Sequence, residues 1–227
     1  MNLQVLVSTM NHKDIFNLLE KMNINSDAII INQCDNHNYE KLNYKEHIIH
    51  LYSFAERGIG LSRNNALMRA TADICLFADD DVTYVDDYKD IILNAFKKKP
   101  EADMILFNVP STNSERPTYR ISSEHRVRLY NCLRYGAVNI AVKTEIIRQK
   151  NIYFSLLFGG GAKYSSGEDS LFIADCIRRG VKVYTNPTII GYVSQEKSSW
   201  FDGYTDKYFI DKGALYEAMT PTYSKLM

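Results

Sequence analysis

Short apolar segments alternate with amphipathic ones over the first hundred residues, and this alternation limits the fold more than any other feature of the sequence. Apolar, β-branched runs predict strands at residues 3–9, 27–33, 47–54 and 73–79. Residues 11–22 place apolar side chains at helical spacing, and residues 58–72 predict a helix with Ser62 as its N-cap. Strands that alternate with helices form a mainly parallel, doubly wound sheet, in which ligands bind beyond the carboxyl ends of the strands.

The second half of the chain continues this pattern less regularly. It predicts a helix at 85–100, a strand at 102–110, a strand followed by a helix within 135–154, a helix from about Gly167, and a strand pair around Pro187. Residues 111–128 are polar and weakly periodic, so we expect an exposed loop or hairpin there. We therefore expect one α/β domain over residues 1–195, with its internal boundary after residue 100 and a tail at 196–227.

Composition excludes some partners and compartments. The chain has 27 Lys and Arg residues and 27 Asp and Glu residues, so its zero net charge gives no general attraction to nucleic acid. Its four cysteines are scattered without CxxC spacing, which predicts buried free thiols in a reducing cytoplasm. The first residues lack the pattern of a signal peptide, and no apolar run approaches 18 residues.

Three consecutive aspartates, Asp79, Asp80 and Asp81, end the predicted strand at 73–79. Carboxylates about 5 Å apart repel by about 3 kcal/mol per pair at an effective dielectric of about 20, so solvent or a cation must offset the repulsion. In an extended segment, Asp79 and Asp81 point to one side and Asp80 to the other. Two such carboxylates with a nucleotide diphosphate form an oxygen cage for Mg²⁺ or Mn²⁺; a solvated turn is the alternative.

Two glycine-containing segments each precede a predicted helix. Gly58 and Gly60 precede the helix that carries Arg63, where phosphate or ribose can be contacted. Glu168 and Asp169 begin the later helix, where the helix dipole stabilises ionised carboxylates. A carboxylate held there can act as a general base toward a hydroxyl, although acids are also ordinary in a first turn.

Taken in order, these segments resemble the family 2 glycosyltransferases, which are inverting enzymes of the GT-A fold. The resemblance spans residues 3–195 and rests on VLVSTMN at 5–11, IIINQCD at 29–35, GLSRNNAL at 60–67, LFADDDV at 76–82 and GEDSLF at 167–172. It implies a Rossmann-like, mainly parallel mixed sheet flanked by helices. Residues 1–100 would bind the nucleotide-sugar, residues 101–195 the acceptor, and the tail at 196–227 would pack on or near the active site.

Carried over by position, the resemblance implies that Asp169 deprotonates the acceptor hydroxyl and that Glu168 positions the acceptor. Asp81 would bind the metal, and Asp79 the metal or the ribose. The residues implied to contact the donor are Thr9, Asn11, Gln33, Asp35, Arg63, Asp79 and Asp80. Gly160, Gly161 and Trp200 would belong to an acceptor site or a lid.

The implied reaction is metal-assisted transfer from a UDP-sugar to a hydroxyl of a glycan or lipid-linked acceptor, with Mn²⁺ or Mg²⁺ as the metal. Many GT-A enzymes add a late histidine ligand, but the stretch after Pro187 has none. Water, Gln195, or carboxylates and phosphates alone would then complete the metal shell. The protein would be cytoplasmic, and peripheral contact with the inner face of the membrane would need a basic or aromatic patch, for which the tail is the candidate.

Two other functions remain open at this stage. A sugar-phosphate nucleotidyltransferase would share the fold, although its glycine-rich, basic phosphate loop is missing after VLVSTMN. A non-catalytic nucleotide- or carbohydrate-binding module would also share the fold, although the retention of both Asp81 and Asp169 argues against it.

Overall fold

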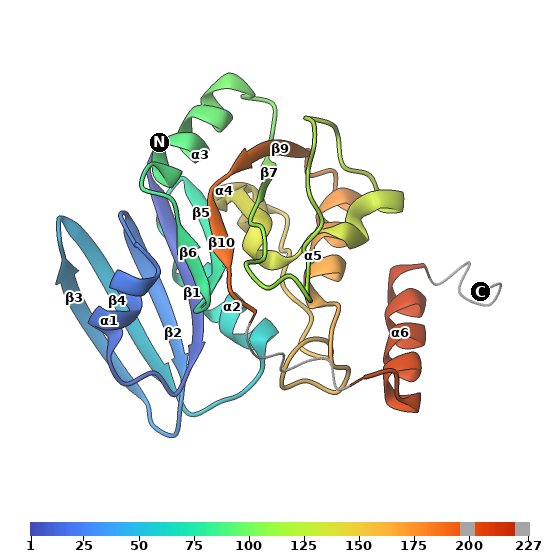
Figure 1. Cartoon of the computed structure of the whole chain (residues 1–227), viewed down its shortest axis with the longest axis horizontal. Coiled ribbons are helices and arrows are strands. Elements are labelled where there is room, and N and C mark those ends of the chain that lie inside the picture. Colours follow the sequence, from blue (N-terminus) through green and yellow to red (C-terminus); the bar gives the residue numbers. More distant parts are fainter. Residues whose placement is uncertain (196–202, 221–227) are drawn as a thin grey trace.

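The apolar N-terminal run forms β1 (Leu3–Met10), which lies inside the sheet between two parallel neighbours, β2 (Asp27–Gln33) and β5 (Ile74–Asp79). Parallel β4 (His47–Phe54) follows β2. In the computed structural model, which describes residues 1–195 and 203–220, the eight strands of this sheet follow the order β3-β4-β2-β1-β5-β8-β7-β9 (Figure 1). The carboxyl ends of four parallel strands therefore meet at one edge, as the alternation predicted.

The far half of the sheet is mixed. Here β8 (Ile140–Lys143) runs antiparallel between β5 and β7 (Met104–Asn108), and β9 (Val183–Ile189) pairs in parallel with β7 at the sheet's edge. The two strands predicted around Pro187 are present as β9 and β10 (Gly191–Val193), but the break lies at Ile190 because β9 continues through Pro187, and the two strands do not pair with each other. An edge strand tolerates proline, since one side of the strand needs no N–H donor.

A separate two-stranded ribbon lies next to the three aspartates. It pairs β6 (Val82–Tyr84), which follows the aspartates directly, with β10 (Gly191–Val193) in antiparallel register. Through this pairing Gln195, two residues after β10, returns to the end of β5. Neither short strand was predicted as part of such a ribbon.

Strand β3 (Asn38–Tyr44) was also missed. It forms the other edge of the sheet and pairs antiparallel with β4. Its sequence, NYEKLNY, carries polar residues at most positions and is largely exposed on both faces, so it lacks the alternation that marks a half-buried strand.

Helices cover both faces of the sheet and produce two cores. On one face, α1 (Ile15–Lys21) and α3 (Tyr88–Lys98) pack with the strand residues that alternate toward them, such as Val5, Val7 and Leu76. On the other face, α2 (Ile59–Arg69), α4 (Thr144–Gln149) and α5 (Glu168–Arg178) pack against residues such as Leu6 and Phe77. Three of the four cysteines, Cys75, Cys132 and Cys176, are buried as free thiols, as predicted.

Helix α2 begins earlier than its sequence suggested. Its first residue is Ile59 and its N-cap is Gly58, so the prediction of Ser62 as N-cap is wrong. The Ser62 side chain is instead buried, and its hydroxyl donates to Ser8 Oγ at 2.8 Å. The earlier start moves Arg63 out of the first turn and toward the sheet.

The remaining segments lie around α5. Residues 111–128 form the predicted exposed loop, which is followed by the short 3₁₀ turns η1 (Leu129–Arg134) and η2 (Ala137–Asn139). Helix α6 (Asp206–Met219), which was not predicted, contacts α5. Figure 1 shows α6 on the α5 side of the molecule, away from β3. Within residues 1–195 and 203–220, no helix combines the length and the apolar character needed to span a bilayer.

Candidate active site

The three aspartates form the turn that follows β5. Asp80 and Asp81 are turn residues, so the segment is not extended, and the predicted same-side placement of Asp79 and Asp81 does not follow. Each carboxylate has a different partner. Asp79 accepts from Arg63, Asp80 Oδ2 accepts from the Thr9 hydroxyl at 2.6 Å, and Asp81 Oδ2 accepts from the backbone N–H of Gln195 at 3.2 Å.

Arg63 joins the aspartate turn to the start of α5. One guanidinium nitrogen lies 2.9 Å from Asp79 Oδ1, and the other lies 2.7 Å from Glu168 Oε1. The side chain of Arg63 is 5% exposed and that of Glu168 is 11% exposed, so both charges are largely removed from water. Burial alone would lower the pKa of Arg63, but the charges of Asp79, Glu168 and Asp169 raise it above its ordinary value.

Negative charge exceeds positive charge at this site. Among the described residues, Asp79, Glu168 and Asp169 act on the single guanidinium of Arg63, and Asp80 and Asp81 add two more carboxylates in the turn that follows Asp79. Burial, helped by the charge of Glu168, raises the pKa of Asp169 to about 7 although Arg63 opposes the shift. Burial and the charge of Asp79 likewise raise the pKa of Asp81. The site therefore favours a bound cation or a proton.

Glu168 is enclosed by the glycine-rich loop before α5. A Cβ added at Gly159, whose φ is +105°, would lie 2.7 Å from Glu168 Oε2, so the loop packs directly on this carboxylate. The next residue, Gly160, accepts a hydrogen bond from Ile59 N at 2.9 Å, and Gly161 lies against Gly58. The predicted acceptor or lid glycines thus lie between the start of α2 and the start of α5.

Asp169 follows Glu168 in the first turn of α5, as its sequence predicted. Its Oδ1 accepts from Ser170 N at 2.7 Å, while its Oδ2 faces Gly136 just before η2. A Cβ added at Gly136 would lie 3.6 Å from this oxygen, in ordinary van der Waals contact. Gly136, which was not among the predicted site residues, therefore forms the wall beside the carboxylate.

Two consecutive amides at the end of β2 hold the loops on either side. Asn32 binds the backbone of His12 twice, accepting from its N–H at 3.0 Å and donating to its carbonyl at 2.9 Å. Gln33 binds the backbone of Gly58 in the same way, with both distances 3.1 Å. Both side chains are buried. The amide of Gln33, predicted to contact the base, is thus engaged by the loop that begins α2, and Asn32 was missed.

A groove lies between the start of α1 and the strands β2, β3 and β4, and its lining does not include the three aspartates. Its volume is about 690 Å³, within the range of small-molecule sites. Asn11 and Asp35, two predicted donor-binding residues, line it together with Asn32 and Cys34. Asp35 is also ion-paired with Arg57 at 2.7 Å, and both side chains are exposed.

The residues present fit a hard divalent cation that also binds phosphate. Within residues 1–195 and 203–220, no three His, Cys, Asp or Glu side chains converge as a preformed metal cage. Mg²⁺ is usually held by one or two carboxylates together with substrate phosphates, so a preformed cage is not required. Such a cation would neutralise the excess carboxylate charge, which together with burial raises the pKa of Asp81. Asp81 and its neighbours would supply the oxygen donors.

Helix α6 fixes the loop that leads into α5. Gly167, the N-cap of α5 with φ +112°, lies under Leu215 of α6, where a Cβ would approach Leu215 Cδ1 to 2.6 Å. Asp211 accepts from the backbone N–H and the hydroxyl of Ser165 at 2.9 and 2.7 Å. Trp200, the predicted lid residue, lies outside the described residues.

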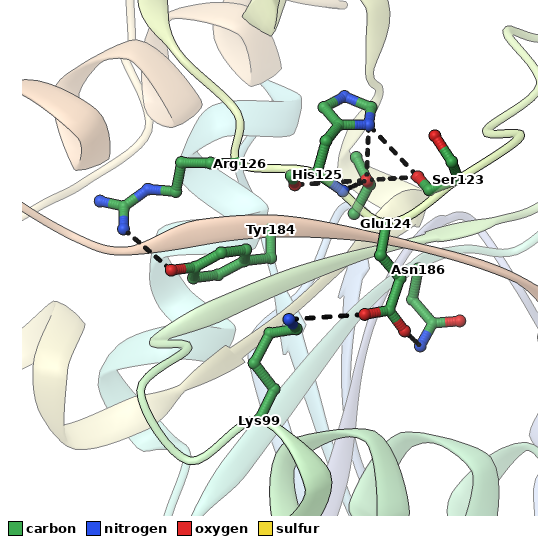
Figure 2. Close-up of polar contacts among 8 residues, drawn as sticks. Lys99, Ser123, Glu124, His125, Arg126, Tyr184 and Asn186 are labelled. Carbon is green, nitrogen blue, oxygen red and sulfur yellow. Dashed lines mark hydrogen bonds and ion pairs between the residues drawn. The ribbon is translucent and has the colours of Figure 1, made fainter.

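One arginine of the polar loop at 111–128, Arg126, packs against the edge strand β9. Figure 2 shows Arg126 reaching the hydroxyl of Tyr184 in β9, at 3.3 Å, and Lys99 also lies 4.8 Å from the centre of that ring. The preceding residue, His125, exchanges hydrogen bonds with Thr185 of β9. This part of the loop is anchored on the edge strand.

Comparison with known proteins supports the relationship that the motifs suggested. No curated protein matches the sequence significantly. Among solved structures, S. aureus TarS 1-349 in complex with UDP-GlcNAc is similar with a TM-score of 0.69 and 18% identity, over 97% of this chain and 67% of that one. A second structure of S. aureus TarS, with a longer chain than TarS 1-349, is similar with a TM-score of 0.63 and 17% identity, over 99% of this chain and 44% of that one. These similarities show a GT-A fold.

The sequence itself matches the family described as glycosyl transferase family 2 over residues 13–154, which is more than half of the chain. The match contains the aspartate turn and Arg63, and α5 with Asp169 follows it. The chain therefore belongs to glycosyl transferase family 2 and is a glycosyltransferase with a GT-A fold.

Proposed function

We propose that this protein transfers a sugar from a UDP-sugar to a hydroxyl of a glycan or lipid-linked acceptor, with inversion at the anomeric carbon. One observation carries the proposal. Arg63 brings the aspartate turn and the start of α5 to one site, with Asp79 on one side of its guanidinium and Glu168 on the other. The family membership and the S. aureus TarS complexes with UDP-GlcNAc and UDP support a nucleotide-sugar as the donor.

On this proposal the donor lies along the carboxyl edge of the sheet. The nucleoside occupies the groove at Asn11 and Asp35, with Thr9 and Asp80 between it and the diphosphate. Asp81, with Asp79 and Asp80 nearby, would hold Mn²⁺ or Mg²⁺. When bound, this cation supplies positive charge to the leaving group. Asn32 and Gln33 act indirectly, because they hold the flanking loops.

Asp169 is the proposed base. Its pKa of about 7 lets it accept a proton near neutral pH and still be deprotonated in much of the population. As the acceptor oxygen bonds to the anomeric carbon, its proton passes to the Asp169 carboxylate. The bond between that carbon and the β-phosphate oxygen breaks, and UDP leaves with the bonding electrons. Glu168, held by Arg63 and Gly159, fixes the start of α5 and so the position of Asp169.

The test is a panel of UDP-sugars incubated with the protein and Mn²⁺, with UDP release and the anomeric proton of the product followed by NMR. Release of UDP with transfer to an added glycan hydroxyl, and an inverted anomeric configuration, is expected. Release of pyrophosphate from a nucleoside triphosphate and a sugar phosphate would instead indicate a nucleotidyltransferase. Donor binding without turnover on any acceptor would indicate a binding module.

A further inference from the structure

The turn η1 exposes an apolar surface that the proposed reaction does not use. Three of its side chains, Leu129, Tyr130 and Leu133, point to solvent, with 44%, 85% and 44% of their surface exposed. On its other face the side chains of Asn131 and Cys132 are buried, and η1 packs on α5. The turn is therefore amphipathic, although its apolar face has no partner within residues 1–195 and 203–220.

Exposed arginines lie next to this apolar surface. Arg128 and Arg134 stand at the two ends of η1, and Arg120 follows Tyr119, whose ring centre lies 5.6 Å from that of Tyr135. Arg120, Arg128 and Arg134 are all exposed, and within the described part of the chain none of them is ion-paired with a carboxylate. Arg134 instead lies over the ring of Tyr119, 5.2 Å from its centre. The acid that precedes η1 most closely, Glu124, is paired with Lys99 at 3.4 Å. We call these six side chains, Leu129, Tyr130, Leu133, Arg120, Arg128 and Arg134, the η1 patch.

The combination identifies the chemistry of the partner. Exposed apolar and aromatic side chains next to exposed arginines suit the boundary between acyl chains and anionic headgroups, where the first contact the acyl chains and the second the phosphates. A protein partner of ordinary composition would have to bury the three unpaired guanidinium groups. The exposed apolar residues of α6, Phe209 and Ile210, differ, because Asp206 lies on the same side and Lys207 is paired with Asp211.

The patch also lies near the candidate base. Only Arg134 and Tyr135 separate Leu133 from Gly136, so the Cα atoms of Leu133 and Gly136 are at most about 11 Å apart. Gly136 in turn faces Asp169 Oδ2. Figure 1 shows the yellow-green segment that contains η1 on the α5 side of the molecule, away from β3. A surface bound at η1 would therefore lie close to the acceptor side of the site.

We propose that the η1 patch binds an anionic lipid surface, with Leu129, Tyr130 and Leu133 entering the headgroup region and the three arginines contacting lipid phosphates. This docking would present a lipid-linked acceptor to Asp169. The presentation of an acceptor to Asp169 rests on the proposed function, whereas the binding of the η1 patch to lipid does not. The membrane contact predicted for the tail at 196–227 stays a separate prediction.

The experiment is co-sedimentation of the full chain with vesicles. Vesicles of phosphatidylcholine containing about one third phosphatidylglycerol should bind the protein, and vesicles of phosphatidylcholine alone should bind it far more weakly. Because salt at about 1 M shortens the Debye length to about 3 Å, it should release most of the protein. Equal binding to both kinds of vesicle, or no binding to either, would overturn the proposal.

Variants locate the binding surface. The triple variant Arg120→Gln/Arg128→Gln/Arg134→Gln should bind anionic vesicles about 100-fold more weakly, at about fivefold per arginine near the membrane. Tyr130→Asp with Leu133→Asp should abolish binding, and because both side chains are exposed the fold should persist. The matched control is Phe209→Asp with Ile210→Asp on α6, which should bind as the wild type does. Wild-type binding by the η1 variants, or loss only in the α6 control, would overturn the proposal.

Two further measurements separate the alternatives. Sedimentation velocity without vesicles should show no self-association that depends on Tyr130. A dimer that Tyr130→Asp dissociates would make the patch an interface between copies and overturn the proposal. UDP release from a UDP-sugar, assayed without vesicles, should be the same in wild type and η1 variants. Failure of vesicle binding with retained UDP release rejects only this inference, whereas vesicle binding without UDP release rejects only the proposed function.

Discussion

Arg63 Nη1 lies 2.7 Å from Glu168 Oε1, across 105 residues of chain. This ion pair links the helix after β4 to the helix that carries Asp169, and the other guanidinium nitrogen continues the link to Asp79 at the end of β5. The three elements that form the site are thus held by one buried cation. The pair is largely buried, so its first role is to position the carboxylates.

Loss of this cation should destabilise the protein. Arg63→Met leaves Glu168 buried and unpaired, and such losses cost about 3 kcal/mol in the free energy of unfolding. For a chain of this size the melting temperature should fall by about 9 °C. Arg57→Met is the control, because its exposed pair with Asp35 should contribute less than about 1 kcal/mol. Equal melting temperatures for the two variants would contradict the buried link.

Replacing the proposed base should separate binding from transfer. Asp169→Asn removes the proton acceptor with little change in shape, so the transfer rate should fall by about 10²- to 10⁴-fold. The dissociation constant for UDP should stay within about twofold, because the groove and the aspartate turn are unchanged. Asp175→Asn, on the exposed side of α5, is the control. Normal turnover by Asp169→Asn would exclude the role.

The raised pKa of Asp169 has consequences for pH dependence. Because its folded pKa is about 7 against an ordinary value of 3.8, the native state binds more protons than the unfolded state between these values. Stability should therefore fall as pH rises from about 4 to 7, and Asp169→Asn should lose this slope. Denaturant titrations across the window measure it. Transfer should show the opposite trend, rising through pH 7 as the base ionises; a flat rate profile there would argue against Asp169.

The contact between α6 and the loop before α5 should depend on Asp211. Burial alone would raise the pKa of Asp211. Hydrogen bonds from Lys207 and Ser165 instead hold this pKa below its ordinary value of 3.8. The stabilisation is therefore present above about pH 4 and is lost as pH falls below it. Asp211→Ala should increase hydrogen exchange in α6, with a local cost of about 1–3 kcal/mol. Asp206→Ala, at the exposed start of α6, should change exchange far less.

The parts of the fold that could be predicted were those with local signals. The run of apolar residues in β1 and β2 and the small residues before α5 indicated a parallel sheet and a helix start, and the structure confirms both. Strand β3 was missed because its side chains are polar on both faces, and α6 because its buried residues, Asp211, Leu215 and Met219, include an acid.

The geometry of the site was less accessible from the sequence. Asp79, Asp80, Asp81 and Asp169 could be nominated, since each follows a strand or begins a helix. The Arg63–Glu168 pair could not, because nothing local indicates a partner 105 residues away. Gln195 reaches Asp81 only through the pairing of β6 with β10. The role of Asn32 and Gln33 in holding the flanking loops had one local signal, which is that two adjacent amides end an apolar strand.

The most direct measurement is a calorimetric titration of UDP, with GDP and CDP for comparison, into the protein with Mn²⁺ and again with a chelator. UDP-selective binding that requires the metal, and that Asp81→Asn weakens by about tenfold or more, is the expected result. Binding of no nucleotide in either condition would contradict the assignment of the aspartate turn as the donor and metal site.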